Sequence, residues 1–430
     1  MDALTIRNQN AMPAPTWGWL KMNSADIRVP EGLERDCQVT IEDADGLLDN
    51  QASFEGAVAK LQARLDAARA DEPEDTRASV RAASGEDVGA ADLDTPALST
   101  YEKCAVRSEV AGDVAADFET GVGADARAYL NMLAGSAAVL ATEAGEHGAA
   151  TVRVDAKPGT ASGASVDVVA AEDSTIDLVI SLDAVDGERL ADEAGTPAAA
   201  GLLGSTLRVF AGTRSRVNVT VYLTADSGFT AIDDSGYVLD EGARVTVRHV
   251  VLGGGFTATG LAADLRGDGS RIDIDTSYLA AEADVRDFNC VVRHRGRKTE
   301  CNIIANGVLT GSSKKVLRGT IDLVHGCKGS QGNERETVLL ANEGVDNKTV
   351  PVILCDEDDV AGNHGATIGH VRPEQTFYAA CRGLSQEATE ALFLEAKLED
   401  AALNAPDDAV RANVVRLGNR LIPDFEEAIA

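Results

Sequence analysis

"RVNVTVYL" at residues 216–223 begins with an arginine and then alternates apolar and polar residues, and the same pattern returns in "RVTVRHVVL" (244–252) and "RIDIDTSYL" (271–279). Alternation with a period of two predicts a strand that buries one of its faces. The arginines are 28 and 27 residues apart, at 216, 244 and 271. A nearly constant step of this length predicts the stacked coils of a solenoid. The first apolar residues after the arginines, expected to form one interior ladder, are Val217, Val245 and Ile272.

The segments between these strands contain no stretch with the 3.6-residue period of a crossover helix. "GFTAID" (228–233) and "GYVLD" (236–240) resemble two short strand pieces cut by glycine and aspartate. Each coil is therefore expected to consist of strands and turns alone. We predict a mainly β fold, a parallel β-helix (solenoid), rather than a doubly wound α/β sheet. A β-sandwich with coincidental spacing is the alternative that the strand pattern leaves open.

Helical patterns flank the repeats on both sides. Residues 51–70 predict an amphipathic helix, because Phe54, Val58, Leu61 and Leu65 line up on one face. A second helix is predicted over 123–141, and the acidic, proline-containing segment between the two reads as a linker.

Beyond Pro373 the pattern becomes helical again, with Gly383 at the end of the first helix, Ser385 as the N-cap of the second and Pro406 as the break before a third. The predicted organisation has three parts: an N-terminal helical and irregular region with the acidic linker (1–145), a β-helix core (146–371) and a C-terminal helical domain (372–430).

The chain is strongly acidic, with a formal net charge of -31 over 430 residues. Such a surface repels phosphate backbones and anionic lipid headgroups, so neither nucleic acid nor a membrane is an expected partner. No apolar run approaches the ~18 residues of a membrane-spanning helix, and no secretion signal is recognised at the start. The seven cysteines are scattered without a CxxC pair. Reduced thiols and a cytoplasmic location are therefore expected.

Motifs for nucleotide hydrolysis, dinucleotide binding, serine hydrolysis and zinc binding are missing from the sequence. Among the six histidines, His364 stands out in "NHGATIGHVRPEQTFYAACRG" (363–383), the densest cluster of His, Phe, Tyr and Cys. An imidazole suits iron, copper or zinc, and the thiol of Cys355 is a softer, weaker candidate. The alternative is that His364 caps a turn in which Gly365 supplies a positive φ angle.

Two stretches, "VLRGTIDLVH" (316–325) and "TVLLANEGVDNKTVPVILCDEDDVAGNHGATIGHVRPEQTFYAACRG" (337–383), resemble the C-terminal core of the SufB/SufD family. These proteins are scaffold subunits of the SUF iron–sulfur cluster assembly machinery and share a parallel β-helix. "HGAT" is similar to SufD, whereas SufB has glutamate after the histidine. SufB also has a cysteine at the head of the strand before the proline, a place that Glu336 takes here. The resemblance therefore implies the SufD role.

The resemblance implies a place for His364 at the interface with a SufB-type paralogue, where a transient cluster forms that neither chain holds permanently. It implies that the C-terminal helices dock a SufC-type ABC ATPase. One departure is Gly362, because many SufD proteins have cysteine there. The docking candidates are Phe377, Tyr378, Arg382, Leu392 and Phe393, and the motif glycines are Gly365 and Gly383.

Two other functions compete with a non-enzymatic scaffold. The first is a β-helix carbohydrate-active enzyme, a polysaccharide lyase or hydrolase, which activity on polyuronates would reveal. The second is a purely structural solenoid, which anaerobic iron–sulfur reconstitution with the partner would separate from a scaffold. A homodimer in place of the SufB-type pairing also stays open.

Overall fold

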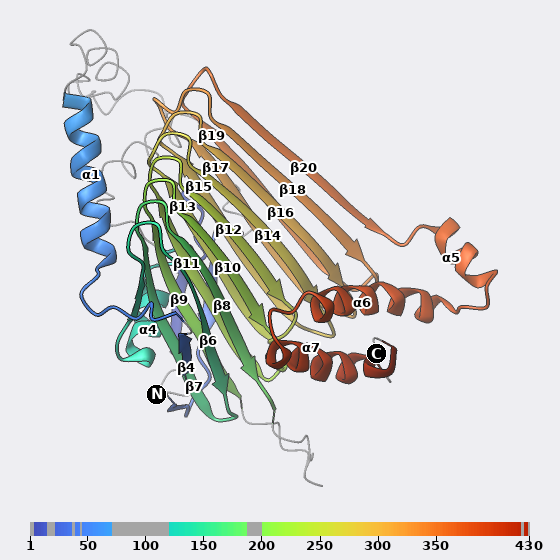
Figure 1. Cartoon of the computed structure of the whole chain (residues 1–430). Helices are drawn as coiled ribbons and strands as arrows, with labels where there is room; N and C mark the ends of the chain where they lie inside the picture. The colour runs from blue at the N-terminus through green and yellow to red at the C-terminus, as the bar shows by residue number, and fades with distance from the viewer. Residues whose placement is uncertain are drawn as a thin grey trace, which may run out of the picture.

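The computed structural model describes residues 4–14, 22–36, 39–43, 45–70, 120–186, 200–422 and 425–428. Its body is a parallel β-solenoid in which the chain passes alternately between two nine-stranded sheets (Figure 1). We call these the even sheet, which runs from β4 to β20 through the even-numbered strands, and the odd sheet, which runs from β3 to β19. Within the two sheets of the described residues, only β4 and β6 pair antiparallel. The predicted solenoid is confirmed, and a β-sandwich is wrong because its sheets would be antiparallel.

The strands of the even sheet are β4 (Val39–Asp43), β6 (His147–Ala156), β8 (Thr175–Ala184), β10 (Arg216–Leu223), β12 (Arg244–Val251), β14 (Arg271–Ala280), β16 (Glu300–Leu309), β18 (Gln331–Leu340) and β20 (Ala361–His370). The strands of the odd sheet are β3 (Glu34–Arg35), β7 (Thr160–Ala170), β9 (Gly201–Ala211), β11 (Phe229–Leu239), β13 (Phe256–Leu265), β15 (Val285–His294), β17 (Lys314–Leu323) and β19 (Asp346–Cys355), with β5 (Ala138–Ala141) beside β7.

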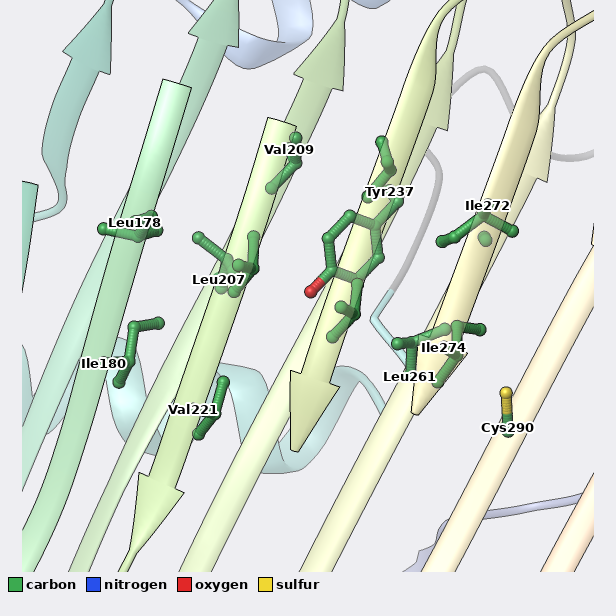
Figure 2. Close-up of a cluster of buried hydrophobic side chains, with 14 of the residues drawn as sticks. Leu178, Ile180, Leu207, Val209, Val221, Tyr237, Leu261, Ile272, Ile274 and Cys290 are labelled. Atoms are coloured by element: carbon green, nitrogen blue, oxygen red, sulfur yellow. The ribbon is translucent and has the colours of Figure 1, made fainter. Parts of the chain in front are cut away.

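The register of the strands confirms the interior ladder that the sequence repeats predicted. Val217 pairs with Val245, and Val245 pairs with Ile272. All three side chains are buried in one continuous apolar core. Figure 2 shows how such inward side chains from successive strands stack on one another between the two sheets. The interior rows thus stack β-branched and aliphatic side chains, together with aromatic and cysteine side chains such as Tyr237 and Cys290, against the coils above and below.

The segment expected to hold two strand pieces forms one strand, β11, that continues through its aspartates. In this strand, buried hydrogen-bond donors of the protein replace water around the aspartate side chain of Asp234. The Asp234 carboxylate accepts hydrogen bonds from the backbone N–H of Val122 (2.8 Å) and from the Thr206 hydroxyl (3.0 Å). The prediction of a break was wrong because these partners lie 112 and 28 residues away in the sequence.

N-terminal elements cover the outer face of the odd sheet. The antiparallel pair β1 (Thr5–Gln9) and β2 (Ala25–Arg28) packs there together with α4 (Ala124–Ala134). The helix α1 (Phe54–Ala70) buries Phe54, Val58 and Leu61 against the same sheet, as its periodicity predicted. The second helix is shorter than predicted, because Gly135 leaves the helix with a φ of 81° and residues 138–141 form β5 instead.

The C-terminal helices are α5 (Pro373–Ala380), α6 (Gln386–Leu403), α7 (Asp408–Leu421) and α8 (Phe425–Ala428). Side chains of α6, α7 and α8 pack on the outer face of the even sheet, against residues of β10, β12, β14 and β16. The Ser385 and Asp407 side chains accept hydrogen bonds from Ala388 N and Val410 N, so both cap their helices. Gly383 has a φ of 86° after α5, as expected for a helix end.

Some predictions fall outside the described residues. These are most of the acidic linker at 71–119 and the cysteines 37 and 104. The three-part division at residues 145 and 371 stays a prediction. In the described part of the chain, no helix combines the length and apolarity needed to cross a bilayer.

Candidate functional site

His364 is the fourth residue of β20, the last strand of the even sheet (Figure 1). It pairs with Glu334 of β18, and Gly365 pairs with Arg335. The reading of His364 as a turn cap is wrong, because both residues lie inside a strand and Gly365 does not have a positive φ. The stretch 363–383 is therefore the place where the solenoid ends and the helical tail begins.

The solenoid is open at this end. β19 and β20 are the terminal strands of their sheets, and no strand of the described residues pairs with their outer edges. Ile353 of β19 and Ile368 of β20 are 37% and 44% exposed. In the preceding coil, the corresponding residues Ile321 and Val338 are only 0% and 2% exposed. His364 lies on the inward row of β20 that also contains Ile368, so its imidazole sits at the rim of the interior.

A second ionisable group lies directly beside it. The Glu334 Oε2 atom is 3.7 Å from His364 Nδ1, and the side chains are 1% and 28% exposed. Neither carboxylate oxygen of Glu334 has a hydrogen-bond partner among the described residues. Burial and the nearby carboxylate of Glu336 raise the pKa of Glu334 to about 7, against the opposing effect of Lys315.

Glu336, two residues further along β18, is fully buried and well satisfied. Its carboxylate accepts hydrogen bonds from the Lys315 ammonium, the Thr349 hydroxyl (2.6 Å) and the Tyr278 hydroxyl (3.3 Å). Burial lowers the pKa of Lys315, and Glu336 opposes that shift. Glu336 is the sixth residue of β18 rather than its head, which corrects the position inferred from the resemblance.

The thiol candidates lie apart from this pair. Cys355 ends β19 in the other sheet, and its thiol donates a hydrogen bond to the Glu357 carbonyl (3.3 Å). A Cβ at Gly362 would lie 2.9 Å from Ile353 Cγ2, so a cysteine there would require Ile353 to move. The described residues contain no group of three or more His, Cys, Asp or Glu side chains arranged to hold a metal ion.

Further inside lies a buried His–Cys pair that the sequence did not single out. His294 Nε2 is 3.2 Å from Cys301 Sγ. Burial raises the pKa of Cys301 to about 12 and lowers that of His294 to about 4. Both groups are therefore neutral at physiological pH, and the thiol is a poor metal ligand in this state.

A ladder of asparagine side chains runs along the outer face of the even sheet and stops at β20. The Asn302 amide donates to Asp273 (2.7 Å), Asn333 donates to Asn302 (3.1 Å), and Asn363 donates to Asn333 (2.9 Å). Asn363 is exposed and belongs to the terminal strand. Its side chain thus presents the next step of the ladder at the open edge.

The candidates for docking on the tail lie on α5, on the turn that follows it and on α6. Phe377 and Tyr378 are 71% and 58% exposed, and Leu392 is 45% exposed. The Arg382 guanidinium stacks over the Tyr378 ring at 3.6 Å, a cation–π contact that holds the two side chains together. Phe393 is half-buried. Large side chains are thus exposed on α5, which follows β20, and on α6.

The fold and the site define a parallel β-solenoid with an open terminal coil that presents a histidine, a buried carboxylate and unpaired strand edges. The family profile described as "SUF system FeS cluster assembly, SufBD core domain" matches residues 152–397. The chain belongs to this family, and it is SufD-like.

Curated relatives share moderate identity with this chain over part of their length. The iron–sulfur cluster assembly protein SufD of Bacillus subtilis (strain 168) is 28% identical over 159 residues, which cover 37% of this chain and 36% of that protein. SufD of Escherichia coli (strain K12) is 23% identical over 185 residues, which cover 43% and 44%. A SufBD family protein of Mycobacterium leprae (strain TN) is 26% identical over 142 residues, which cover 33% and 16%. The chain thus spans less than half the length of these relatives.

Proposed function

We propose that this chain is the SufD-like subunit of an iron–sulfur cluster assembly scaffold, without enzymatic activity of its own, and that His364 holds part of the nascent cluster. The observation that carries the proposal is the position of His364 on the inward row of the open terminal coil. The cluster is cargo here, so it must be held and then released. One neutral imidazole shared with a partner's thiolate binds iron more weakly and with more pH dependence than four thiolates do.

A SufB-type paralogue is the proposed partner at the open end. The outer edges of β19 and β20 offer backbone N–H and C=O groups for pairing with a strand of another chain. Asn363 can continue the asparagine ladder into that strand, and Ile353 and Ile368 offer apolar area that pairing would bury. A second copy of this chain could use the same edges, so a homodimer is the alternative partner.

A SufC-type ABC ATPase is the proposed partner of the tail. Phe377, Tyr378 and Leu392 are exposed aromatic and aliphatic groups of the kind that anchor protein interfaces, and Arg382 fixes the orientation of the Tyr378 ring. Replacing Phe377 and Tyr378 with serine should abolish ATPase binding and leave pairing through β20 intact. Retained ATPase binding in calorimetry would move the docking site away from α5.

The proposed compartment is the cytoplasm, because Cys290, Cys301, Cys327 and Cys381 are thiols outside any disulfide. We further propose that the chain holds no permanent cofactor.

The test of the histidine's role is the anaerobic yield of cluster from the complex co-expressed with both partners. His364→Ala should still fold and bind both partners but fail to support assembly. His364→Cys supplies a thiolate, which also ligates iron, and should restore part of the yield or trap the cluster. His370→Ala is the matched control, because His370 lies six residues away on the same strand and is exposed. A normal yield with His364→Ala would overturn the assignment.

A further inference from the structure

The two inward carboxylates of β18, those of Glu334 and Glu336, differ in the hydrogen bonds and charge partners that they have. Glu336 shares its charge with Lys315 and accepts three hydrogen bonds. Glu334 is 3% exposed, and within the part of the chain that the structure describes neither of its oxygens has a hydrogen-bond partner. A buried carboxylate without partners costs free energy, so its retention points to a partner that is absent from the isolated chain.

The fold provides space for Glu334 to reach the rim. Gly319 of β17 faces it from the odd sheet, and a Cβ at Gly319 would lie 2.3 Å from Glu334 Oε1. Any other residue at 319 would therefore displace the carboxylate. The glycine is in the middle of a buried strand, where it weakens the sheet unless a close approach requires it. The carboxylate thus lies 3.7 Å from the ring of His364, whose side chain is 28% exposed.

The separation between the two groups fits a shared cation better than a hydrogen bond. The 3.7 Å between Glu334 Oε2 and His364 Nδ1 exceeds the usual limit for a hydrogen bond. Nitrogen and oxygen ligands bound at ~2.1 Å to one tetrahedral first-row metal ion lie about 3.4 Å apart. A small rotation of the imidazole would therefore place both atoms on one ion.

We propose that Glu334 is a second donor to the metal that His364 receives, so that the open coil carries a carboxylate–imidazole pair for a divalent first-row cation such as Fe²⁺. This inference rests on the proposed function, in which His364 holds nascent cluster iron. The cation neutralises the carboxylate that Lys315 leaves unpaired, and the partner subunit or solvent supplies the remaining ligands. An oxygen–nitrogen pair holds Fe²⁺ less tightly than thiolates do, in keeping with a site that passes its iron on.

The probe is Co²⁺, whose visible absorption reports coordination by protein ligands, titrated into the purified full chain without partners. Because the chain is acidic, the titration is run at about 0.15 M salt with excess Mg²⁺ to occupy surface carboxylates. Glu334→Gln and His364→Ala should each weaken Co²⁺ binding at least tenfold. The loss in the double variant should be smaller than the sum of the two single losses, because both changes act on the same ion.

Two controls address folding and charge. Asp358→Asn removes one exposed carboxylate near the same end of the solenoid and should leave Co²⁺ binding unchanged. Glu334→Gln keeps the shape of the side chain, and its thermal transition is compared with that of the wild type to show that it folds.

Wild-type Co²⁺ affinity in Glu334→Gln would overturn this inference and leave His364 as the only donor. The absence of Co²⁺ binding by the wild type, alone and in the co-expressed complex, would overturn it too. A normal cluster yield from the Glu334→Gln complex would show that Glu334 is not needed for cluster assembly. The proposed role of His364 would not be affected by that result. Failure of the proposed function is a separate result, namely a normal cluster yield with His364→Ala.

Discussion

Lys315→Met should destabilise the terminal coils strongly, because it removes the only cation among the described residues that contacts Glu336. Both side chains of this ion pair are 0% exposed. Methionine has a similar length but no charge, so Glu336 would keep the hydroxyls of Thr349 and Tyr278 and lose its counterion. Breaking a buried pair in this way costs about 3–5 kcal/mol. We expect a loss of this size in the free energy of unfolding at about pH 8.

Urea unfolding followed by circular dichroism measures the effect, with the midpoint shift converted through the slope of the transition. The double variant Lys315→Met/Glu336→Gln removes both charges and should recover most of the loss. A loss below about 1 kcal/mol at pH 8, or a double variant no more stable than the single one, would refute the argument that the pair is a desolvated ion pair.

Three further predictions follow from the buried core. Burial and the neighbouring carboxylate of Asp234 raise the pKa of Asp233 to about 7, so its ionised form destabilises the fold as the pH rises. Asp233→Asn should then raise the unfolding free energy by about 3–4 kcal/mol at pH 8 and by almost nothing near pH 4; an equal gain at both would contradict it. Ile272→Ala, in the interior ladder, should cost about 2–5 kcal/mol in the same urea assay, and a cost below 1 kcal/mol would mean that the ladder is loosely packed. Tyr222→Phe removes a hydroxyl whose single proton is shared between the carbonyls of Ala401 (3.1 Å) and Asn404 (3.0 Å). It should cost about 0.5–1.5 kcal/mol in total and speed amide hydrogen exchange in α6, while unchanged exchange there would count against the role of this hydroxyl.

The solenoid could be predicted because its signal is local and repeated. Arg216, Arg244 and Arg271 each start an alternating strand, and the step between them requires no knowledge of distant contacts. The error at residues 138–141 has the opposite cause. "AVLA" suits a helix and a strand equally, and only the pairing of β5 with β7 decides between them.

The site was only half predictable. His364 stood out by composition, but "HGAT" has the small residues of a turn, and it is the pairing with β18 that keeps it extended. The alternation in "QGNERETVLL" places Glu334 on the same inward face as Val338, so the strand pattern alone could have identified it as a buried carboxylate. A charged residue at an inward position conflicts with burial, and its partner histidine lies 30 residues away. The sequence alone does not reveal that contact.

The helical tail also has a mechanical consequence. A solenoid under tension usually peels one coil at a time from its end. Here the chain leaves β20 at the terminal coil and then folds back, so that α6 to α8 pack on strands from β10 to β16 in the middle of the stack (Figure 1). A force applied at the C-terminus would first have to shear these packed helices from several coils at once. We expect single-molecule pulling to show one high-force rupture before the smaller steps of the coils, and the open rim to stay intact until that rupture.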